Sequence, residues 1–472
     1  MSVDTLIQAA YFAAAFLFIY GLKRMSSPVT ARSGIIVAGW GMVVAVLASF
    51  LYVFDVAEAA KPHLTTNIVL VAIALGVGLG WAWRSGKTVE MTAMPQMVAL
   101  YNGMGGGAAA AIAAIELFGH KAHGPIVLTL AVLGGLIGAV SLSGSLIAWA
   151  KLDGRVNGTW RFSALQAVNG SLLLVLLIMG GYTVVQGGDV SMGLIAAFFI
   201  LALVYGVMMT MPIGGADMPV VISLYNAFTG LAVGFEGYVL QNPALMIAGM
   251  VVGSAGTLLT LLMAKAMNRS VSNVLFSNFG AAGGEEESIE GTMKSAEAGD
   301  AGIQMRYASK VIIAPGYGLA VAQAQHKLYE FVKLLQANDV EVKFAIHPVA
   351  GRMPGHMNVL LAEAGVPYDI IHDMEDINEE FAQADVAIVV GANDTVNPAA
   401  RTRESSPIYG MPILNCDMAK QVYVVKRGQG KGYSGVENEL FFRDNCNMVY
   451  GDAQKVMVQM INAVKELEGG GH

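Results

Sequence analysis

Residues 311–321 read VIIAPGYGLAV, and this run indicates the fold of the second part of the chain. Its apolar start predicts a buried strand, and the pattern Gly316-x-Gly318-x-x-Val321 then leads into a helix. In that context the first glycine allows a tight turn, and the second allows a pyrophosphate to approach the backbone. The helix N-terminus would meet the negative charge. The stretch therefore predicts an α/β fold that binds a dinucleotide.

Strands and helices are expected to alternate around this stretch. Strands are expected over 309–314, 341–347, 370–372, 386–390, 412–415 and 422–425, and helices near 318–337, 356–364 and 378–383. Short β-rich runs that alternate with helices predict a parallel, doubly wound sheet. We therefore expect a soluble Rossmann-like domain over residues 307–472.

The first 270 residues have the composition of a membrane protein. The chain is 55% hydrophobic and 13% charged, with a mean hydropathy of +0.56. A helix needs about 20 apolar residues to cross a bilayer. Runs of this kind are expected near 4–22, 33–54, 64–83, 94–117, 125–149, 164–186, 190–210, 218–240 and 243–267. These nine runs predict a multi-span α-helical bundle over 1–270, followed by a flexible acidic linker over 271–306.

Charge gives the orientation of the bundle and excludes one class of partner. Basic loop residues gather on one side of the predicted membrane, and only Lys61 and Lys121 lie on the other. The positive-inside rule then places the C-terminal domain in the cytoplasm. That domain is acidic, so it offers no basic face for a nucleic acid. Cys416 and Cys446 have no spacing that suggests a metal site, and we expect reduced thiols.

One repeat within the bundle concerns function. Met94-Pro95-x4-Leu100-Tyr101-Asn102 recurs as Met218-Pro219-x4-Leu224-Tyr225-Asn226. Either a duplication preserved a packing solution, or Asn102 and Asn226 point inward and line a polar path across the membrane. Asp217 precedes the second copy at the cytoplasmic side. It is a candidate for coupling, or simply a charge that faces a helix N-terminus.

Two features of the soluble part bear on the choice of dinucleotide. An NAD site usually has a carboxylate after its second strand, whereas this strand ends at His347 and Arg352 follows. The loop Lys426-Arg427-Gly428 could clamp an additional phosphate, or it could be a solvated turn. Both features favour NADP. Asp394, after an apolar strand, could bind or tune the cofactor, although Asn-Asp is also ordinary turn chemistry.

Long motifs in both parts of the chain resemble those of one known family. They are residues 212–219, 314–325, 391–398 and 425–427, which read PIGGADMP, APGYGLAVAQAQ, GANDTVNP and VKR. With them the chain closely resembles the beta subunits of proton-translocating NAD(P)+ transhydrogenases over essentially its whole length.

The resemblance implies reversible hydride transfer from NADH to NADP+, which regenerates NADPH and is driven by inward proton movement. NADP(H) would bind this chain, and NAD(H) would bind an alpha subunit that carries additional membrane helices. A dimer of such protomers in a bacterial inner membrane is expected, in contact with lipid. Arg269 would act as the hinge between the two parts. The cofactor would be bound or tuned by Gly316, Tyr317, Gly318, Ala320, Val321, Arg352, Gly391, Asn393, Asp394, Lys426, Arg427, Gly428 and Tyr433.

One departure from the family pattern affects the proton path. Some members have a membrane histidine at the position of Asn102, and none of the nine predicted spans of this chain contains a histidine. A carboxamide does not titrate usefully, so we expect the protonatable group to be a histidine on a membrane helix of the partner subunit. Asn102, Asn226 and water would complete the path. The alternative function is a secondary transporter or channel subunit that a nucleotide-binding domain regulates.

Overall fold

The chain forms two compact units. The computed structural model describes residues 3–55, 63–119, 124–156, 158, 160, 162, 164–214, 217–268, 270–276, 289, 291–353, 355–406, 408–428, 430, 432 and 434–469. One unit consists of Met1–Ile213 and Val221–Thr260, and the other of Gly214–Val220 and Leu261–His472.

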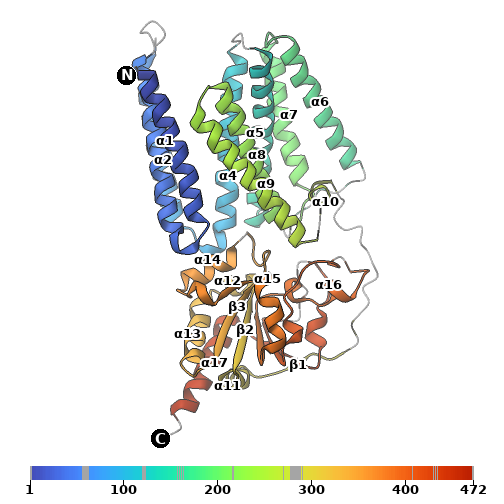
Figure 1. The fold of residues 1–472 in the computed structure, drawn as a ribbon. Coiled ribbons are helices and arrows are strands. Elements are labelled where there is room, and N and C mark those ends of the chain that lie inside the picture. Colours follow the sequence, from blue (N-terminus) through green and yellow to red (C-terminus); the bar gives the residue numbers. More distant parts are fainter. Residues whose placement is uncertain are drawn as a thin grey trace. The chain divides into compact units, whose positions relative to one another are not determined.

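Long apolar helices make up the first part of the chain (Figure 1). Within the described residues, nine are long and apolar enough to cross a membrane, in agreement with the nine predicted spans. They are α1 (Val3–Met25), α2 (Pro28–Asp55), α3 (Leu64–Thr88), α4 (Met94–Phe118), α5 (Pro125–Leu152), α6 (Leu165–Val185), α7 (Met192–Thr210), α8 (Met218–Val239) and α9 (Pro243–Ala266). A short helix, α10 (Val271–Phe276), follows them.

Small residues bring the backbones of neighbouring helices together. A Cβ atom built on Gly106 of α4 would lie 3.0 Å from the carbonyl oxygen of Gly138 in α5. A Cβ on Gly138 would lie 2.6 Å from the oxygen of Gly106, and one on Gly230 would lie 2.3 Å from the nitrogen of Gly253 in α9. Larger side chains would push these helices apart, as expected where association depends on close packing.

The second part of the chain is an α/β domain with a 7-stranded sheet in which every recorded strand pair is parallel. The strand order is β1-β7-β6-β5-β2-β3-β4. From β2 the chain passes outward to β3 and β4, then returns to the other side of β2 for β5, β6 and β7. The strands are β1 (Lys294–Ser295), β2 (Lys310–Pro315), β3 (Glu341–Ile346), β4 (Ile371–Asp373), β5 (Val386–Val390), β6 (Gln421–Lys426) and β7 (Cys446–Tyr450).

Both faces of this sheet are covered, which explains why its strands are apolar throughout. All five residues of β5 are buried. Alternate residues, among them Ile312 and Val389, pack with Phe381 in one core cluster. Helix α17 contacts both α11 and α13, and a face of the sheet is covered where α13 packs on β3 and α17 packs on β6. The helices of this domain are α11 (Ala298–Arg306), α12 (Tyr317–Val321), α13 (Gln325–Gln336), α14 (His356–Glu363), α15 (Met374–Ile377), α16 (Ala399–Thr402) and α17 (Ala453–Gly469), with 3-10 turns at Tyr368–Ile370, Asn378–Gln383, Asp394–Val396, Cys416–Met418 and Glu439–Phe442. A further 3-10 turn, Met91–Ala93, precedes α4 in the first part of the chain.

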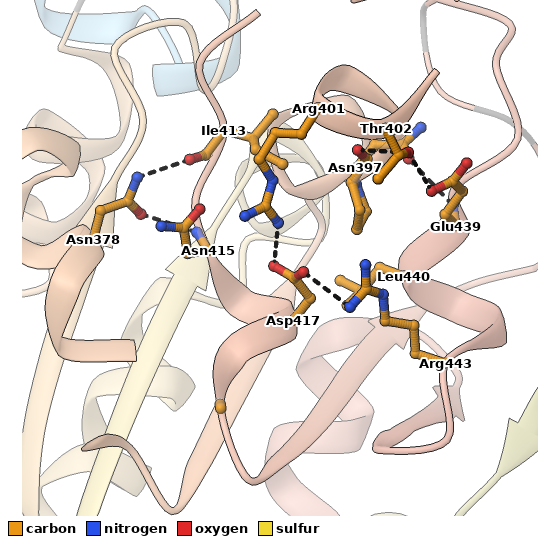
Figure 2. Close-up of polar contacts among 12 residues, drawn as sticks. Asn378, Asn397, Arg401, Thr402, Ile413, Asn415, Asp417, Glu439, Leu440 and Arg443 are labelled. Carbon is orange, nitrogen blue, oxygen red and sulfur yellow. Dashed lines mark hydrogen bonds and ion pairs between the residues drawn. The ribbon is translucent and has the colours of Figure 1, made fainter. Parts of the chain in front are cut away.

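Three of the predicted elements differ in the structure. No strand forms over 412–415, because the side chain of Asn378 binds the backbone there: its Nδ2 donates to Ile413 O at 2.9 Å and its Oδ1 accepts from Asn415 N at 2.9 Å (Figure 2). The helix expected over 318–337 is two helices, α12 and α13, separated by Gln323 with a φ of 49°. The helix expected over 378–383 is a 3-10 turn.

Sequence patterns also missed elements at both ends of the domain. The last part of the range predicted as a linker forms β1 and α11, which pack on β7 and α17. Neither β7 nor α17 was predicted. Strand β1 has only two residues, and a run of that length carries no apolar periodicity.

Candidate functional site

The predicted cofactor residues follow four adjacent strands. In a parallel sheet the carboxyl ends of the strands lie along one edge, so the loops after β6, β5, β2 and β3 lie side by side there. Lys426 is the last residue of β6, and the loops after β5, β2 and β3 contain Asp394, the glycine turn and Arg352, respectively. The strand order reverses between β5 and β2, and this is where open α/β sheets bind ligands.

Hydrogen bonds hold the glycine turn against the loop after β5. The backbone nitrogen of Gly316 donates to Val390 O at 2.9 Å, and that of Gly318 donates to Gly391 O at 2.9 Å. A Cβ on Gly316 would lie 2.4 Å from Gly391 O, and a Cβ on Gly318 would lie 2.7 Å from Gly391 Cα. Gly316 has an extended backbone, with φ −137°. The turn therefore needs glycine because two loops approach closely. Of the three glycines Gly316, Gly318 and Gly391, only Gly391, with φ +72°, also has a left-handed backbone.

Arg352 and Tyr317 lie together beside this turn. The guanidinium carbon of Arg352 is 4.4 Å from the centre of the Tyr317 ring, which is a cation–π distance. The Arg352 backbone nitrogen donates to His356 Nδ1 at 3.2 Å. Burial, with a smaller contribution from Arg352, lowers the pKa of His356. The loop after β3 thus presents a cation over an aromatic ring at the place where an NAD site usually has a carboxylate.

His347, at the end of β3, is buried and neutral. Its Nε2 donates to Pro412 O at 2.7 Å, and its Nδ1 accepts from Val349 N at 3.2 Å. Burial lowers the pKa of His347 to about 4, although the hydrogen bond to Pro412 opposes this shift. His347 therefore fixes the loop after β3 to the segment around Pro412.

Asp394 joins the loop after β5 to the basic loop after β6. Its carboxylate accepts hydrogen bonds from Ser434 N at 3.0 Å and from Ser434 Oγ at 2.7 Å. A Cβ on Gly432 would lie 2.3 Å from Asp394 Oδ1, so glycine is required beside the carboxylate. Asn393 is bound in a similar way, because Asn438 Nδ2 donates to its backbone and side-chain oxygens at 3.0 Å each. These contacts position the basic loop.

Lys426 lies at the carboxyl end of β6 with its ammonium group 4.7 Å from the Phe441 ring centre. Its Nζ also donates to Gly430 O. Burial lowers the pKa of Lys426, and the negative charge of Asp394 acts in the opposite direction. Arg427 and Gly428, the next two residues, are exposed.

The remaining predicted cofactor residues are placed less favourably or lie outside the described part. Ala320 is 1% exposed and belongs to the core, whereas Val321 is 38% exposed. Tyr433 and the predicted hinge residue Arg269 lie outside the described residues.

Two ion pairs meet at the buried carboxylate of Asp417 and join segments that neighbour these loops. Asp417 accepts from Arg401 at 2.6 Å and pairs with Arg443 at 3.2 Å (Figure 2). Thr402 donates to Glu439 at 2.8 Å, which joins α16 to the segment after the basic loop. The loops around the edge are thus fixed by side chains from distant parts of the sequence.

In the membrane half, Asn102 belongs to a chain of buried polar groups. Its Nδ2 donates to Ser145 Oγ in α5 at 3.0 Å, and its backbone oxygen accepts from Thr229 Oγ1 in α8 at 3.4 Å. Thr229 also hydrogen-bonds Ser141 at 2.6 Å. Asn226 lies one turn before Thr229 and is half-buried, and in the described residues no hydrogen bond joins it to Asn102.

Asp217 precedes the first residue of α8 and is 4% exposed. A buried carboxylate at this place is compatible with either of its predicted roles, because both require proximity to the start of that helix.

Comparison with known proteins identifies the family. The family model for the NAD(P) transhydrogenase beta subunit matches residues 7–463. Two relatives, both NAD(P) transhydrogenase subunit beta of Rhodospirillum rubrum and one of them from a named strain, are each 45% identical over 472 residues. The match covers 98% of this chain and 99% of each relative. The chain belongs to the NAD(P) transhydrogenase beta subunit family.

Membership confirms the resemblance inferred from the glycine turn and the three other motifs. As an NAD(P) transhydrogenase beta subunit, the chain is part of an enzyme and has an alpha subunit as its partner. It is a membrane protein whose apolar helices are followed by a domain with a parallel sheet. The family name describes a subunit of an enzyme, and not the alternative of a transporter subunit that a nucleotide only regulates.

Two acidic residues of this beta subunit were not among the predicted site residues. Glu116 lies near the end of α4 and Glu236 near the end of α8, and both fall inside predicted spans. They are 8% and 1% exposed, respectively. A carboxyl group within an apolar membrane span is energetically costly and therefore usually has a function. The two glutamates within apolar runs could have been recognised from the sequence alone.

Proposed function

We propose that this beta subunit binds NADP(H) along the carboxyl ends of β3, β2, β5 and β6. The observation that carries the proposal is the strand order, which reverses beside the glycine turn. The donors suit a nucleotide with an additional phosphate, because Lys426 and Arg427 follow β6 and a cation follows β3 where a carboxylate would favour NAD. We assign Lys426 and Arg427 to the 2′-phosphate and the glycine turn to the pyrophosphate.

Bound NADP(H) would supply the hydride chemistry, and the residues of this chain bind and orient it. Arg352 and Tyr317 enclose the site beside β3. Asp394 positions the basic loop through its hydrogen bond from Ser434, and its negative charge acts to raise the pKa of Lys426. The hydride donor is NADH on the alpha subunit, so the reaction requires contact between an alpha and a beta chain. As the family resemblance implies, two such protomers form a dimer.

Hydride transfer is coupled in this proposal to inward proton movement across a bacterial inner membrane, with the soluble domain in the cytoplasm. The buried chain of Asn102, Ser145, Thr229 and Ser141 supports a polar path through the membrane half. Asn226 and Asp217 belong to this path, and a histidine on a membrane helix of the alpha subunit takes up the proton.

The test uses the full chain reconstituted with its alpha subunit in vesicles. We expect NADH to reduce an NADP analogue and the vesicle lumen to change pH during the reaction. Calorimetry on the beta chain should show tighter binding of NADPH than of NADH. A complex that binds NADPH but transfers no hydride would instead support regulation of a transporter.

A further inference from the structure

The membrane half contains a carboxyl pair that the polar chain around Asn102 does not include. Glu236 of α8 is 1% exposed, and neither of its carboxyl oxygens has a hydrogen-bond partner in the described residues. Glu116 of α4 is a second buried acid nearby: Ala113, one turn before it, would meet a Cβ on Gly135 of α5 at 3.0 Å, and Gly134, the neighbour of Gly135, lies against Glu236. A lone structural acid would be expected to find a donor, because an unsatisfied buried polar group is costly.

Glycine in α5 makes the space that the Glu236 carboxyl group occupies. A Cβ built on Gly134 would lie 2.2 Å from Glu236 Oε1. Even an alanine at position 134 would therefore collide with the carboxyl group. The site is built by three helices, since α8 carries Glu236, α5 provides the gap and α4 carries Glu116.

The carboxyl group lies on the same face of α8 as the polar chain. Tyr225, Thr229, Ala232 and Glu236 are spaced by three or four residues and are all buried, so they form one stripe. On α4, Asn102 and Glu116 are both buried as well. At a rise of 1.5 Å per residue, Thr229 and Glu236 are about 10 Å apart along the helix axis. Water or a partner side chain has to bridge this distance.

Two carboxyl groups in an apolar bundle cannot both be charged at low cost. Like charges repel strongly in a medium of low polarity, and within the described residues no basic side chain donates a hydrogen bond to either Glu236 oxygen. One proton held by the pair removes most of this cost. A group that holds a proton in the membrane, next to a chain of hydroxyl and carboxamide groups, can exchange it along that chain.

We propose that Glu236, with Glu116 beside it, is a proton-binding site of this chain. In the binding step a hydronium ion gives a proton to a Glu236 carboxylate oxygen: one hydronium O–H bond breaks, a carboxyl O–H bond forms, and a water molecule is left. In the release step this O–H bond breaks, a bridging water accepts the proton and passes it toward Thr229 and Asn102, and the Glu236 carboxylate is regenerated. This inference rests on the proposed proton movement, and it adds a protonatable group on this chain to the histidine expected on the partner.

The experiment uses the complete alpha–beta complex in vesicles and compares Glu236→Gln with Glu90→Gln. Glutamine keeps the size of the side chain and removes the titrating group. Glu90, in the connection before α4, is exposed, so its variant removes an equal charge from the same half of the chain. We expect proton uptake per hydride transferred to fall to background in Glu236→Gln, to recover in part in Glu236→Asp, and to be unchanged in Glu90→Gln. NADPH binding should be unchanged in all three variants.

A second measurement separates a proton site from a packing defect. Infrared difference spectra recorded over a range of pH should contain a carboxylic acid C=O band that is absent from Glu236→Gln and present in Glu90→Gln. Normal proton uptake with an unchanged pH profile in Glu236→Gln, or an identical band in that variant, would overturn the inference. A wild-type complex that transfers hydride without moving protons would instead refute the proposed function, whatever the infrared band shows.

Discussion

Three glycines meet where β2 and β5 end, and each is needed for contact between two loops. Gly316 and Gly318 have no room for a side chain because the backbone of Gly391 lies against them. In a glycine motif of this kind the residues are usually assigned to the approach of the ligand. Here the approach of the protein's own backbone already requires them.

Gly318→Ala is therefore expected to destabilise the soluble domain as well as weaken NADPH binding. The added methyl group would lie 2.7 Å from Gly391 Cα, and such overpacking typically costs about 1–3 kcal/mol. Thermal unfolding and NADPH titration of the purified chain would measure both effects. Gly299→Ala in α11 is the control, since its methyl group would meet Ala463 at an ordinary 3.5 Å. Equal melting temperatures for the two variants would contradict the prediction.

Lys426→Met should weaken NADPH binding by roughly 10- to 100-fold, because a hydrogen bond to a charged group contributes about 1.5–3 kcal/mol. Lys420 lies just before the other end of β6, is 71% exposed and pairs with Asp385 at 2.7 Å. Lys420→Met is thus a matched control that should bind NADPH normally. Titration calorimetry would measure the NADPH affinity of each variant. Similar affinities for both variants would show that Lys426 does not bind NADPH.

Elements are joined at this edge by polar side chains that reach across the fold. His347 connects the end of β3 to Pro412, Asp394 connects the loops after β5 and β6, and Asn378 satisfies the backbone around Ile413. The last contact explains why 412–415 is not a strand. Its apolar residues are buried as a strand's would be, but side chains bind its backbone at Pro412, Ile413 and Asn415, and Leu414 N donates to the Thr395 backbone oxygen outside the sheet at 2.9 Å.

The connection through His347 should make stability depend on pH. Its pKa is lowered from 6.5 to about 4 in the folded chain, so the unfolded chain takes up the proton first as the pH falls. Stability from this residue is complete above about pH 6.5 and decreases toward pH 4, by up to about 1.4 kcal/mol per pH unit. Chemical unfolding of the full chain at pH 7 and pH 5 should show the loss.

In His347→Gln the difference in stability between pH 7 and pH 5 should be smaller, although the variant is less stable overall. His326 is exposed at the second position of α13, and His326→Gln should retain the full difference. A wild-type difference that persists in His347→Gln would assign the acid sensitivity to other groups.

At the scale of the whole molecule, the two halves have separate cores and separate polar systems. The edge of the sheet carries the cations that we assign to NADP(H), and the helix bundle carries hydroxyl, carboxamide and carboxyl groups. The proposed coupling requires that damage to the membrane path affects proton movement without affecting the affinity for NADPH.

Replacing Asn102 and Asn226 together by Leu tests this separation. Asn102 is 9% exposed and donates to Ser145, so leucine would break the polar chain. We expect proton movement in vesicles to be lost, with NADPH affinity unchanged. Asn67→Leu on the exposed surface of α3 is the control. Normal pumping and coupling in the double variant would exclude the two asparagines from the path.

Properties that depend on local composition can be predicted from amino-acid order alone. Each of the nine long apolar runs is a helix within the described residues, and the run 386–390 is β5, because burial and periodicity depend on neighbouring residues. The absence of a carboxylate after β3 could be recognised for the same reason. Contacts between distant residues, such as Gly318 with Gly391 or Asp394 with Ser434, are set by tertiary packing. It likewise placed Glu236 against Gly134. Packing between elements sets these pairs, and no local pattern encodes them.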